Sequence, residues 1–284
     1  MVRQLPGSTS RRVGRAARED RRARLRACWP PRARAPRAAP QRVQYTTATL
    51  SEGIVDEGPL KVISSMATRG VLAELASEYQ RAARQTVDTE AAGGVDVAER
   101  VRAGEEFDVV VLASKVIDEL IAEGRLTGPR VDVVSSPTAV AVRAGAPRPD
   151  IDSEAAVRQA VSTATSLSYS TGPSGRYLES LFDRWGILGD IRPRIVVPPP
   201  GVPVATLVAD GAAEIGFQQL SELIGHPGIE VLGPLPPKIQ RVTVFSGAVG
   251  ARCPRADAAR ALLAFLAAPA TADTKRRYGM GSPG

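Results

Sequence analysis

Two hydrophobic patterns alternate along the chain from Leu60 onward. Short, nearly continuous apolar runs predict buried strands at 60–64, 107–112, 131–134, 139–143, 167–170, 194–197, 213–217, 231–232 and 240–245. Between these runs, apolar residues recur every three or four positions and predict helices at 68–84, 95–102, 114–123, 154–163, 175–185, 202–209, 220–224 and, as the last helix, 255–267. Repeated alternation of strand and helix predicts an α/β fold with largely parallel sheets.

Residues 1–59 lack this alternation, and we expect them to form a disordered, arginine-rich leader. Thirteen arginines and two acidic residues lie within 1–43, which gives this segment a net charge of +11. A basic arm that binds nucleic acid, an export or organellar leader, and a solvated or spuriously included extension are the alternatives. No apolar run in the segment is as long as a secretory signal or a membrane span requires, so the chain as written predicts neither.

The remainder of the chain is mildly acidic. The whole chain carries +7, so a net charge of −4 remains outside residues 1–43. This sign argues against a nucleic-acid-binding surface on the folded part. Cys28 and Cys253 are the only cysteines, which argues against a disulfide framework.

The stretch Ser168–Tyr177 combines a strand end, a turn rich in hydroxyl groups and glycine, and the first turn of a helix. The leading amides of a helix have no intrahelical partners and the helix dipole is positive there, so such a junction can hold an anion. Thr171 and Ser174 would add hydroxyl donors, and Gly175 would let a ligand approach the backbone. An ordinary helix cap is the alternative.

Further strand-to-helix junctions also carry small or neutral polar residues. They lie at Ser64–Thr68, Ala91–Gly94, Pro200–Val202 and Phe217–Gln219. Ligands of open α/β sheets bind at the carboxyl ends of strands, where helix N-termini point inward. Neutral donors that converge there suit an oxyanion.

Signatures of catalysis are weak. The residues around Ser174 lack the glycine spacing of a nucleophile elbow, and the single histidine, His226, precedes Pro227 in an expected loop. One histidine and one cysteine in the domain offer no metal site, and neither a P-loop nor a dinucleotide fingerprint is present. We therefore expect a binding protein that is not an enzyme and uses no metal or cofactor; a serine-dependent or carboxylate-dependent enzyme is the alternative.

Three segments together resemble the molybdate-binding family of ABC-importer substrate-binding proteins. They are Lys61–Thr68, Pro173–Tyr177 with its Pro-small-Gly-x-Tyr helix start, and the helix-to-strand segment 211–219. With the other segments in the matching order, the resemblance covers about residues 60–280.

This resemblance implies a two-lobe architecture of the type II periplasmic-binding-protein kind, with mixed sheets and a hinge. Residues 60–140 and 236–284 would form lobe one and residues 141–235 lobe two, with the anion held between the lobes. The ligand-binding residues that the resemblance implies are Ser65, Met66, Ala67, Thr68, Gly93, Gly94, Thr171, Ser174, Gly175, Gly201 and Val202, with a backbone amide of the 201–202 loop as donor, and Gln219 where the family often has a tyrosine.

The same resemblance implies capture of a small oxyanion and its delivery to an ABC importer permease in the periplasm. Met66–Thr68 stands in place of the Ser-Leu-Thr common in the family, and Gly93–Gly94 in place of its serines. Molybdate, tungstate, sulfate and a small organic anion therefore all stay open as the ligand. A cytosolic ligand sensor of the same fold is the alternative, because the chain as written shows no secretory signal. We also expect a monomer.

Overall fold

The computed structural model describes residues 58–283. Its strands form one eight-stranded sheet in the order β2-β1-β3-β8-β4-β6-β5, with β7 paired to β4. The predicted leader therefore lies, up to residue 57, outside the described residues. Within residues 58–283, no helix combines the length and the apolar character that crossing a membrane requires.

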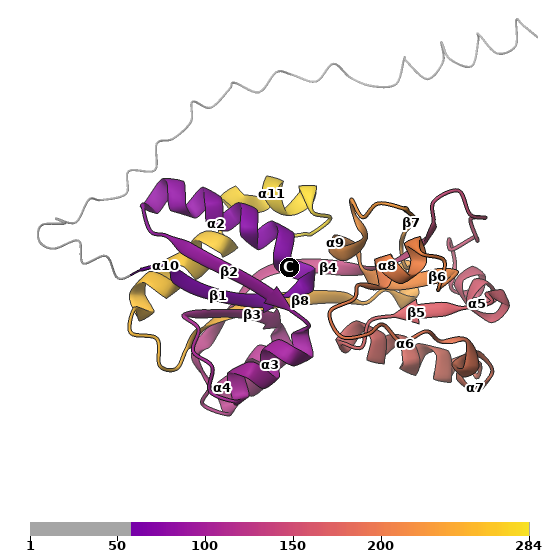
Figure 1. Cartoon of the computed structure of the whole chain (residues 1–284), viewed down its shortest axis with the longest axis horizontal. Helices are drawn as coiled ribbons and strands as arrows, with labels where there is room; N and C mark the ends of the chain where they lie inside the picture. The colour runs from indigo at the N-terminus through magenta and orange to yellow at the C-terminus, as the bar shows by residue number, and fades with distance from the viewer. Residues whose placement is uncertain (1–57, 284) are drawn as a thin grey trace, which may run out of the picture. The chain divides into compact units, whose positions relative to one another are not determined.

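The first half of the sheet is built on three parallel strands. β1 (Leu60–Ser65) lies between β2 (Val87–Ala92) and β3 (Val109–Ala113), and β8 (Val242–Gly250) continues the sheet antiparallel to β3. One face is covered by α2 (Arg69–Ala83) and α10 (Ala256–Ala267), with α11 (Ala272–Arg277) beside α2. The other face is covered by α3 (Gly94–Arg102) and α4 (Ser114–Ala122), as Figure 1 shows.

The second half surrounds the end of β4 (Leu126–Arg143). Here β6 (Ile215–Gln219) and β7 (Ile229–Pro234) pair antiparallel to β4, and β5 (Leu167–Tyr169) pairs parallel to β6. On one face, Phe182 and Phe217 are fully buried among α5 (Glu154–Thr163), α6 (Pro173–Arg184) and α7 (Leu188–Ile191). On the other face lie the short helices α8 (Val204–Ala209) and α9 (Leu220–Leu223).

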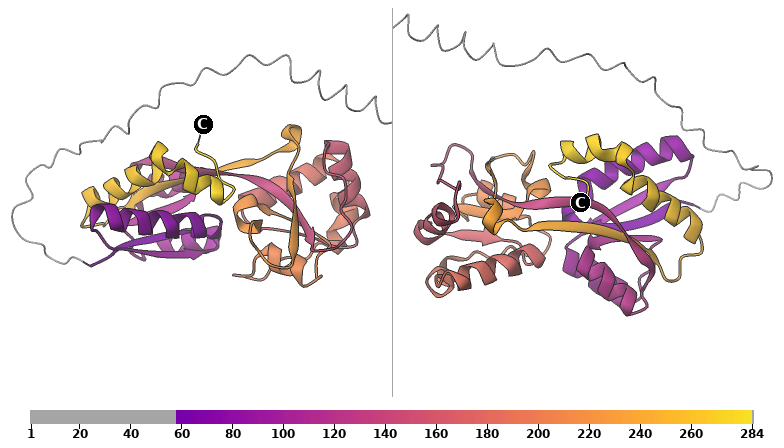
Figure 2. Two further views of the ribbon diagram at one scale, coloured as in Figure 1. Left: turned by 90° about the horizontal axis from the view of Figure 1, so that it is seen from above. Right: turned by 180° about the vertical axis from the view of Figure 1, so that it is seen from behind.

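Two strands run through both halves and connect them. β4 pairs with β8 as far as Pro137 opposite Val242, and from Thr138 onward it pairs with β6. Figure 2 shows β4 and β8 as the two segments that pass between the halves. This arrangement confirms the predicted α/β class with two lobes and mixed sheets, while the exact lobe boundaries at 140/141 and 235/236 remain a prediction.

Several elements differ from the prediction. Residues 131–143 form one strand instead of two, because Ser136 and Pro137 stay in register with β8 despite their local preference for a turn. The strand predicted at 194–197 reduces to a single bridge between Ile195 and Leu167. The edge strand β2 was not predicted because its side chains alternate between exposed and partly buried, and α11 follows the helix expected to be last.

Candidate functional site

The carboxyl ends of β1 and β2 bring the first two predicted loops side by side, because the ladder pairs Ser65 with Ala92. Ser65 precedes the 3-10 turn η1 (Met66–Thr68), and its hydroxyl accepts a hydrogen bond from the Ala67 amide at 3.2 Å. The buried Thr68 hydroxyl donates to the Ser65 carbonyl at 2.9 Å. The Ser65 hydroxyl therefore accepts a bond and still has its proton to donate, whereas the Thr68 hydroxyl already donates its own. Ala67 is buried and Met66 is partly exposed.

The second loop carries an acidic neighbour that sequence reasoning missed. Gly93 is the N-cap of α3, and the first intrahelical bond runs from the Val97 amide to its carbonyl at 2.9 Å, so the Gly94 amide precedes that bond. A Cβ atom at Gly93 would lie 2.7 Å from Oδ2 of Asp96. The Asp96 carboxylate thus fills the space beside Gly93 and repels an anion there.

The third loop provides the free amides that its sequence predicts. Pro173 lies in the first turn of α6, and the Arg176 amide donates the first intrahelical bond to the carbonyl of Gly172 at 3.1 Å. The amides of Ser174 and Gly175 precede that bond and are the free donors of the helix. The buried Ser174 hydroxyl shares a 2.9 Å hydrogen bond with the Ser170 hydroxyl. Thr171 is exposed and provides no side-chain cap.

The glycine at position 175 has a structural cause that differs from the predicted one. A Cβ atom there would lie 1.6 Å from the carbonyl oxygen of Ser170 and 3.2 Å from the Tyr169 ring. The first turn of α6 therefore packs directly against the end of β5. Gly175 is required by this close backbone approach, before any ligand is considered.

The fourth loop uses one predicted donor for its own turn. Gly201 has φ +77°, and the Val202 amide donates to the Pro199 carbonyl at 3.0 Å. Four residues closed by such a hydrogen bond form a β-turn, and the positive φ at its third residue favours glycine there. Of the two backbone amides at the predicted 201–202 contact, that of Val202 serves this turn. The Val204 amide at the start of α8 is a further donor that precedes the intrahelical bonds.

Gln219 is buried with one end of its amide unsatisfied. Its Nε2 atom donates to the Thr243 hydroxyl at 2.8 Å, and its Oε1 atom has no partner among the described residues. Because the two ends of an amide are nearly isosteric, rotating it would let Thr243 donate to Oε1 and free the NH₂ group. In either orientation one polar atom needs a bond from outside the protein. An anion would select the orientation that presents the NH₂ group.

Polar contacts between the two halves gather at these loops. α9 follows β6 directly and contacts η1, and Figure 1 shows it beside the first turn of α2. The Ser221 amide on α9 donates to the Ser136 hydroxyl of β4 at 3.5 Å, and Gln219 reaches Thr243 of β8. The first loop, the α9 region and both crossing strands therefore meet, while the third loop lies beside Gln219 through the pairing of β5 with β6.

Glu222 on α9 was not among the predicted residues. Its carboxylate accepts one hydrogen bond, from Gln218 Nε2 at 2.8 Å, and burial raises its pKa to about 7. Gln218 Oε1 in turn accepts from the Ala205 amide at the start of α8, at 3.3 Å. Glu222 is thus linked through Gln218 to the start of α8, the helix that follows the fourth loop. The sequence alone gave no signal for it, because a glutamate on a short helix is ordinarily solvated.

Three arginines at these junctions are exposed and form no ion pair within residues 58–283. Arg69 begins α2, Arg176 lies in the first turn of α6, and the Arg241 guanidinium lies over the Tyr177 ring, 6.0 Å from its centroid. Unpaired guanidinium groups suit a ligand with several carboxylates, because each can bind one of them in a bidentate way.

Within residues 58–283, neither Asp108 nor His226 belongs to a second site. Asp108 beside β3 accepts hydrogen bonds from the Lys61 amide, Cys253 and Arg255, which makes it structural. Over the described part of the chain, no group of three or more His, Cys, Asp or Glu residues is placed to hold a metal. His226 contacts the Thr206 hydroxyl at 3.3 Å and the Pro227 carbonyl at 2.8 Å.

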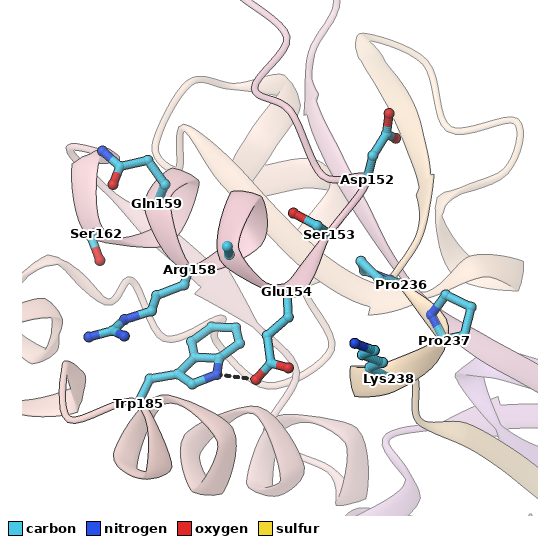
Figure 3. A pocket seen from close by; sticks show the side chains of 11 residues that line it. Asp152, Ser153, Glu154, Arg158, Gln159, Ser162, Trp185, Pro236, Pro237 and Lys238 are labelled. Atoms are coloured by element: carbon cyan, nitrogen blue, oxygen red, sulfur yellow. Dashed lines mark hydrogen bonds between the residues drawn. The ribbon is translucent and has the colours of Figure 1, made fainter.

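A hollow of about 970 Å³ lies on the second half, away from all the predicted residues (Figure 3). It is lined by Asp152, Ser153, Glu154, Ala155, Arg158, Gln159, Ser162, Trp185, Pro236, Pro237 and Lys238. The Trp185 indole already donates to Glu154 at 2.7 Å, and side chains of both signs line the hollow. It therefore offers no converging set of donors to an anion.

Comparison with known proteins gives three kinds of match. A family model described as bacterial extracellular solute-binding protein matches residues 60–281. A protein named aconitate isomerase from a Pseudomonas species is 38% identical over 217 residues, which cover 73% of this chain and 82% of that protein. The fold also matches a periplasmic molybdate-binding protein from Azotobacter vinelandii, with a TM-score of 0.66, 18% identity and coverage of 79% of this chain and 100% of that chain. A sulfate-binding protein from Mycobacterium tuberculosis matches with a TM-score of 0.64 and 16% identity, over 78% of this chain and 86% of that chain.

These matches confirm the predicted family resemblance and correct one expectation. The prediction that the chain is not an enzyme is wrong in the light of the 38% identical relative, whose name is that of an isomerase. Sequence reasoning failed here because it searched for nucleophile and metal spacings.

Proposed function

The chain belongs to the bacterial extracellular solute-binding proteins, and we propose that it binds a small unsaturated polycarboxylate between its two halves and isomerises it as an aconitate isomerase does. The observation that carries this proposal is the 38% identity, over most of both chains, to a protein of that name. The polar residues that meet between β1, β6 and the crossing strands support it.

The donors at the site match a ligand with several carboxylates. The free amides at the start of α6, the Ser65 hydroxyl and the Gln219 amide offer neutral donors, and Arg69 and Arg176 offer charge. Hydrogen bonds to charged groups contribute roughly 1.5–3 kcal/mol each. Micromolar affinity needs about −8 kcal/mol, so four to seven such bonds suffice after the cost of association.

The isomerisation requires few catalytic groups. In aconitate, a CH₂ group and a C=C bond flank the same carbon, so cis and trans isomers interconvert when a proton leaves the CH₂ carbon and another reaches the outer alkene carbon. The chemistry needs one acid–base group and donors that stabilise the delocalised anion. A solute-binding fold that holds an anionic ligand between two lobes would supply both.

Family membership itself favours a second candidate function. In this alternative the chain captures an inorganic oxyanion, molybdate, tungstate or sulfate, outside the cytoplasm and delivers it to an ABC importer. What supports it is the family model and the fold shared with molybdate-binding and sulfate-binding proteins. The Asp96 carboxylate beside Gly93 disfavours a small dianion there more than a ligand that can place a neutral part next to it.

One experiment on the full chain separates the two candidates. The protein is incubated with cis-aconitate in D₂O, and proton NMR follows trans-aconitate and deuterium in the substrate. In parallel, thermal unfolding is measured with aconitate, molybdate, tungstate, sulfate and phosphate, where a ligand at about 100 times its Kd stabilises by roughly 2.7 kcal/mol.

We expect isomerisation with deuterium incorporation, and stabilisation by aconitate. A folded protein that leaves aconitate unchanged and is stabilised only by an inorganic oxyanion would instead support the capture function. A folded protein that responds to no anion would refute both candidates.

A further inference from the structure

We propose that Glu222 is the acid–base residue that moves the substrate proton, held in place by Gln218. This role rests on the proposed function, because it assigns the proton transfer of that reaction to one side chain. It is not implied by any motif in the sequence. It follows from how β6, α8 and α9 meet.

The carboxylate is fixed from two sides. Gln218 Nε2 donates to Glu222 Oε1 at 2.8 Å, while Gln218 Oε1 accepts the Ala205 amide at 3.3 Å. The Gln218 side chain is buried, so the orientation of Glu222 is coupled to the backbone at the start of α8. The rest of α9 is oriented by Ser221, whose amide donates to the Ser136 hydroxyl of the crossing strand β4 at 3.5 Å.

Glu222 lies on a short helix that is linked to two of the predicted ligand loops. α9 contacts η1 of the first loop, and Gln218 joins Glu222 to the helix that follows the fourth loop. Gln219, the neighbour of Gln218 on β6, carries the unsatisfied amide atom. Gln219 is also the N-cap residue of α9, so a substrate bound to its amide would lie at the start of that helix.

Glu222 also has the chemical character that the step needs. It forms no ion pair within the described part of the chain, and its one hydrogen bond leaves Oε2 free to take a proton. Burial raises its pKa to about 7, so both protonation states are populated near neutral pH.

The step balances with this one group. The Glu222 carboxylate takes a proton from the CH₂ carbon, the C–H electron pair forms the new C=C bond, and the old C=C pair moves to the outer alkene carbon. That carbon then receives the proton from the Glu222 carboxylic acid. Nothing is oxidised, Glu222 is regenerated, and the orientation in which the CH₂ arm is held decides the isomer formed.

Other groups near the loops are less suited to the task. The Asp96 carboxylate is exposed to solvent beside Gly93. The Ser174 hydroxyl shares its hydrogen bond with Ser170. Both imidazole nitrogens of His226 contact Thr206 or Pro227. Of these, Asp96 is the one with a free carboxylate, and it serves as the competing candidate in the test.

The test compares Glu222→Gln with Asp96→Asn and with Glu99→Gln, a control that removes an exposed carboxylate from α3. Loss of a general acid–base group lowers turnover by roughly 10²- to 10⁴-fold. We expect that loss, and equal loss of deuterium exchange, only in Glu222→Gln. Stabilisation by aconitate should persist in it, because the amide is nearly isosteric with the carboxylate.

Glu222→Asp, which keeps the carboxyl group but shortens its reach, should recover part of the exchange and guards against a folding defect in the glutamine variant. Full turnover in Glu222→Gln, or a selective loss in Asp96→Asn, would overturn the role of Glu222 while the proposed function stands. A wild-type chain that binds aconitate without exchange or turnover would refute the proposed function and this role with it.

Discussion

Replacing Gly175 by alanine tests the backbone geometry of the third loop most directly. The added Cβ atom would lie 1.6 Å from the Ser170 carbonyl oxygen and 2.8 Å from its carbon. Both neighbours are backbone atoms at the end of β5, so no flexible side chain can move aside. Either the first turn of α6 or the end of β5 must shift, which also displaces the free amides of Ser174 and Gly175.

Overpacking costs about 1–3 kcal/mol, and the rigid neighbours place Gly175→Ala near the upper limit. For a domain of this size roughly 2–4 °C of Tm corresponds to each kcal/mol, so we expect Tm to fall by about 6–12 °C. Ligand stabilisation should fall as well, because the displaced amides no longer converge on the anion.

The matched control is Gly189→Ala in α7, where an added Cβ would meet nothing within 4 Å. Alanine in a helix is favoured over glycine, so its Tm should stay level or rise. Thermal unfolding with and without aconitate or molybdate measures both effects. If Gly175→Ala melts like the wild type and keeps its ligand response, the close packing of α6 on Ser170 is refuted as the reason for this glycine.

Three further predictions concern buried and half-buried polar groups. Lys275 is 1% exposed, its Nζ atom has no partner among the described residues, and burial lowers its pKa. Lys275→Met should therefore raise the free energy of unfolding by about 1–3 kcal/mol in urea titrations, with Lys115→Met, at an exposed position, as the control. A destabilised Lys275→Met variant would contradict this. The pKa of Glu222 is raised from 4.5 to about 7, so the folded state binds the proton of this carboxyl group more tightly than the unfolded state does. As the pH rises from 4.5 to 7, the free energy of unfolding of the wild type should fall by up to about 3 kcal/mol relative to that of Glu222→Gln. Parallel pH profiles of the two proteins would disprove this prediction. Gln219→Leu should weaken ligand affinity by roughly tenfold in calorimetry, whereas Gln159→Leu, at an exposed position, should leave the affinity unchanged. Unchanged affinity in Gln219→Leu would show that Gln219 is not part of the site.

Much of the fold was accessible from the sequence because its signals are local. The buried runs at Leu60 and Val109, and the amphipathic segments after them, set strand and helix without reference to distant residues. The Pro173–Tyr177 start of α6 was recognisable for the same reason. Strand β4 was predicted as two pieces, since only its pairing with β8 shows that Ser136 and Pro137 remain extended.

The features of the site also separate into those set by the local sequence and those set by the fold. Small residues at the ends of strands and proline and glycine at helix starts are encoded locally. The sequence by itself therefore determined an α/β fold and a solute-binding family, and it predicted anion binding at the junctions. The tertiary structure decided what those junctions contain: Asp96 beside Gly93, the Val202 amide used by a turn, the unsatisfied Gln219 amide and the half-buried Glu222. These features depend on burial and on partners far along the chain. The charge state and bonding of a polar side chain are properties of its surroundings, which only the folded chain supplies.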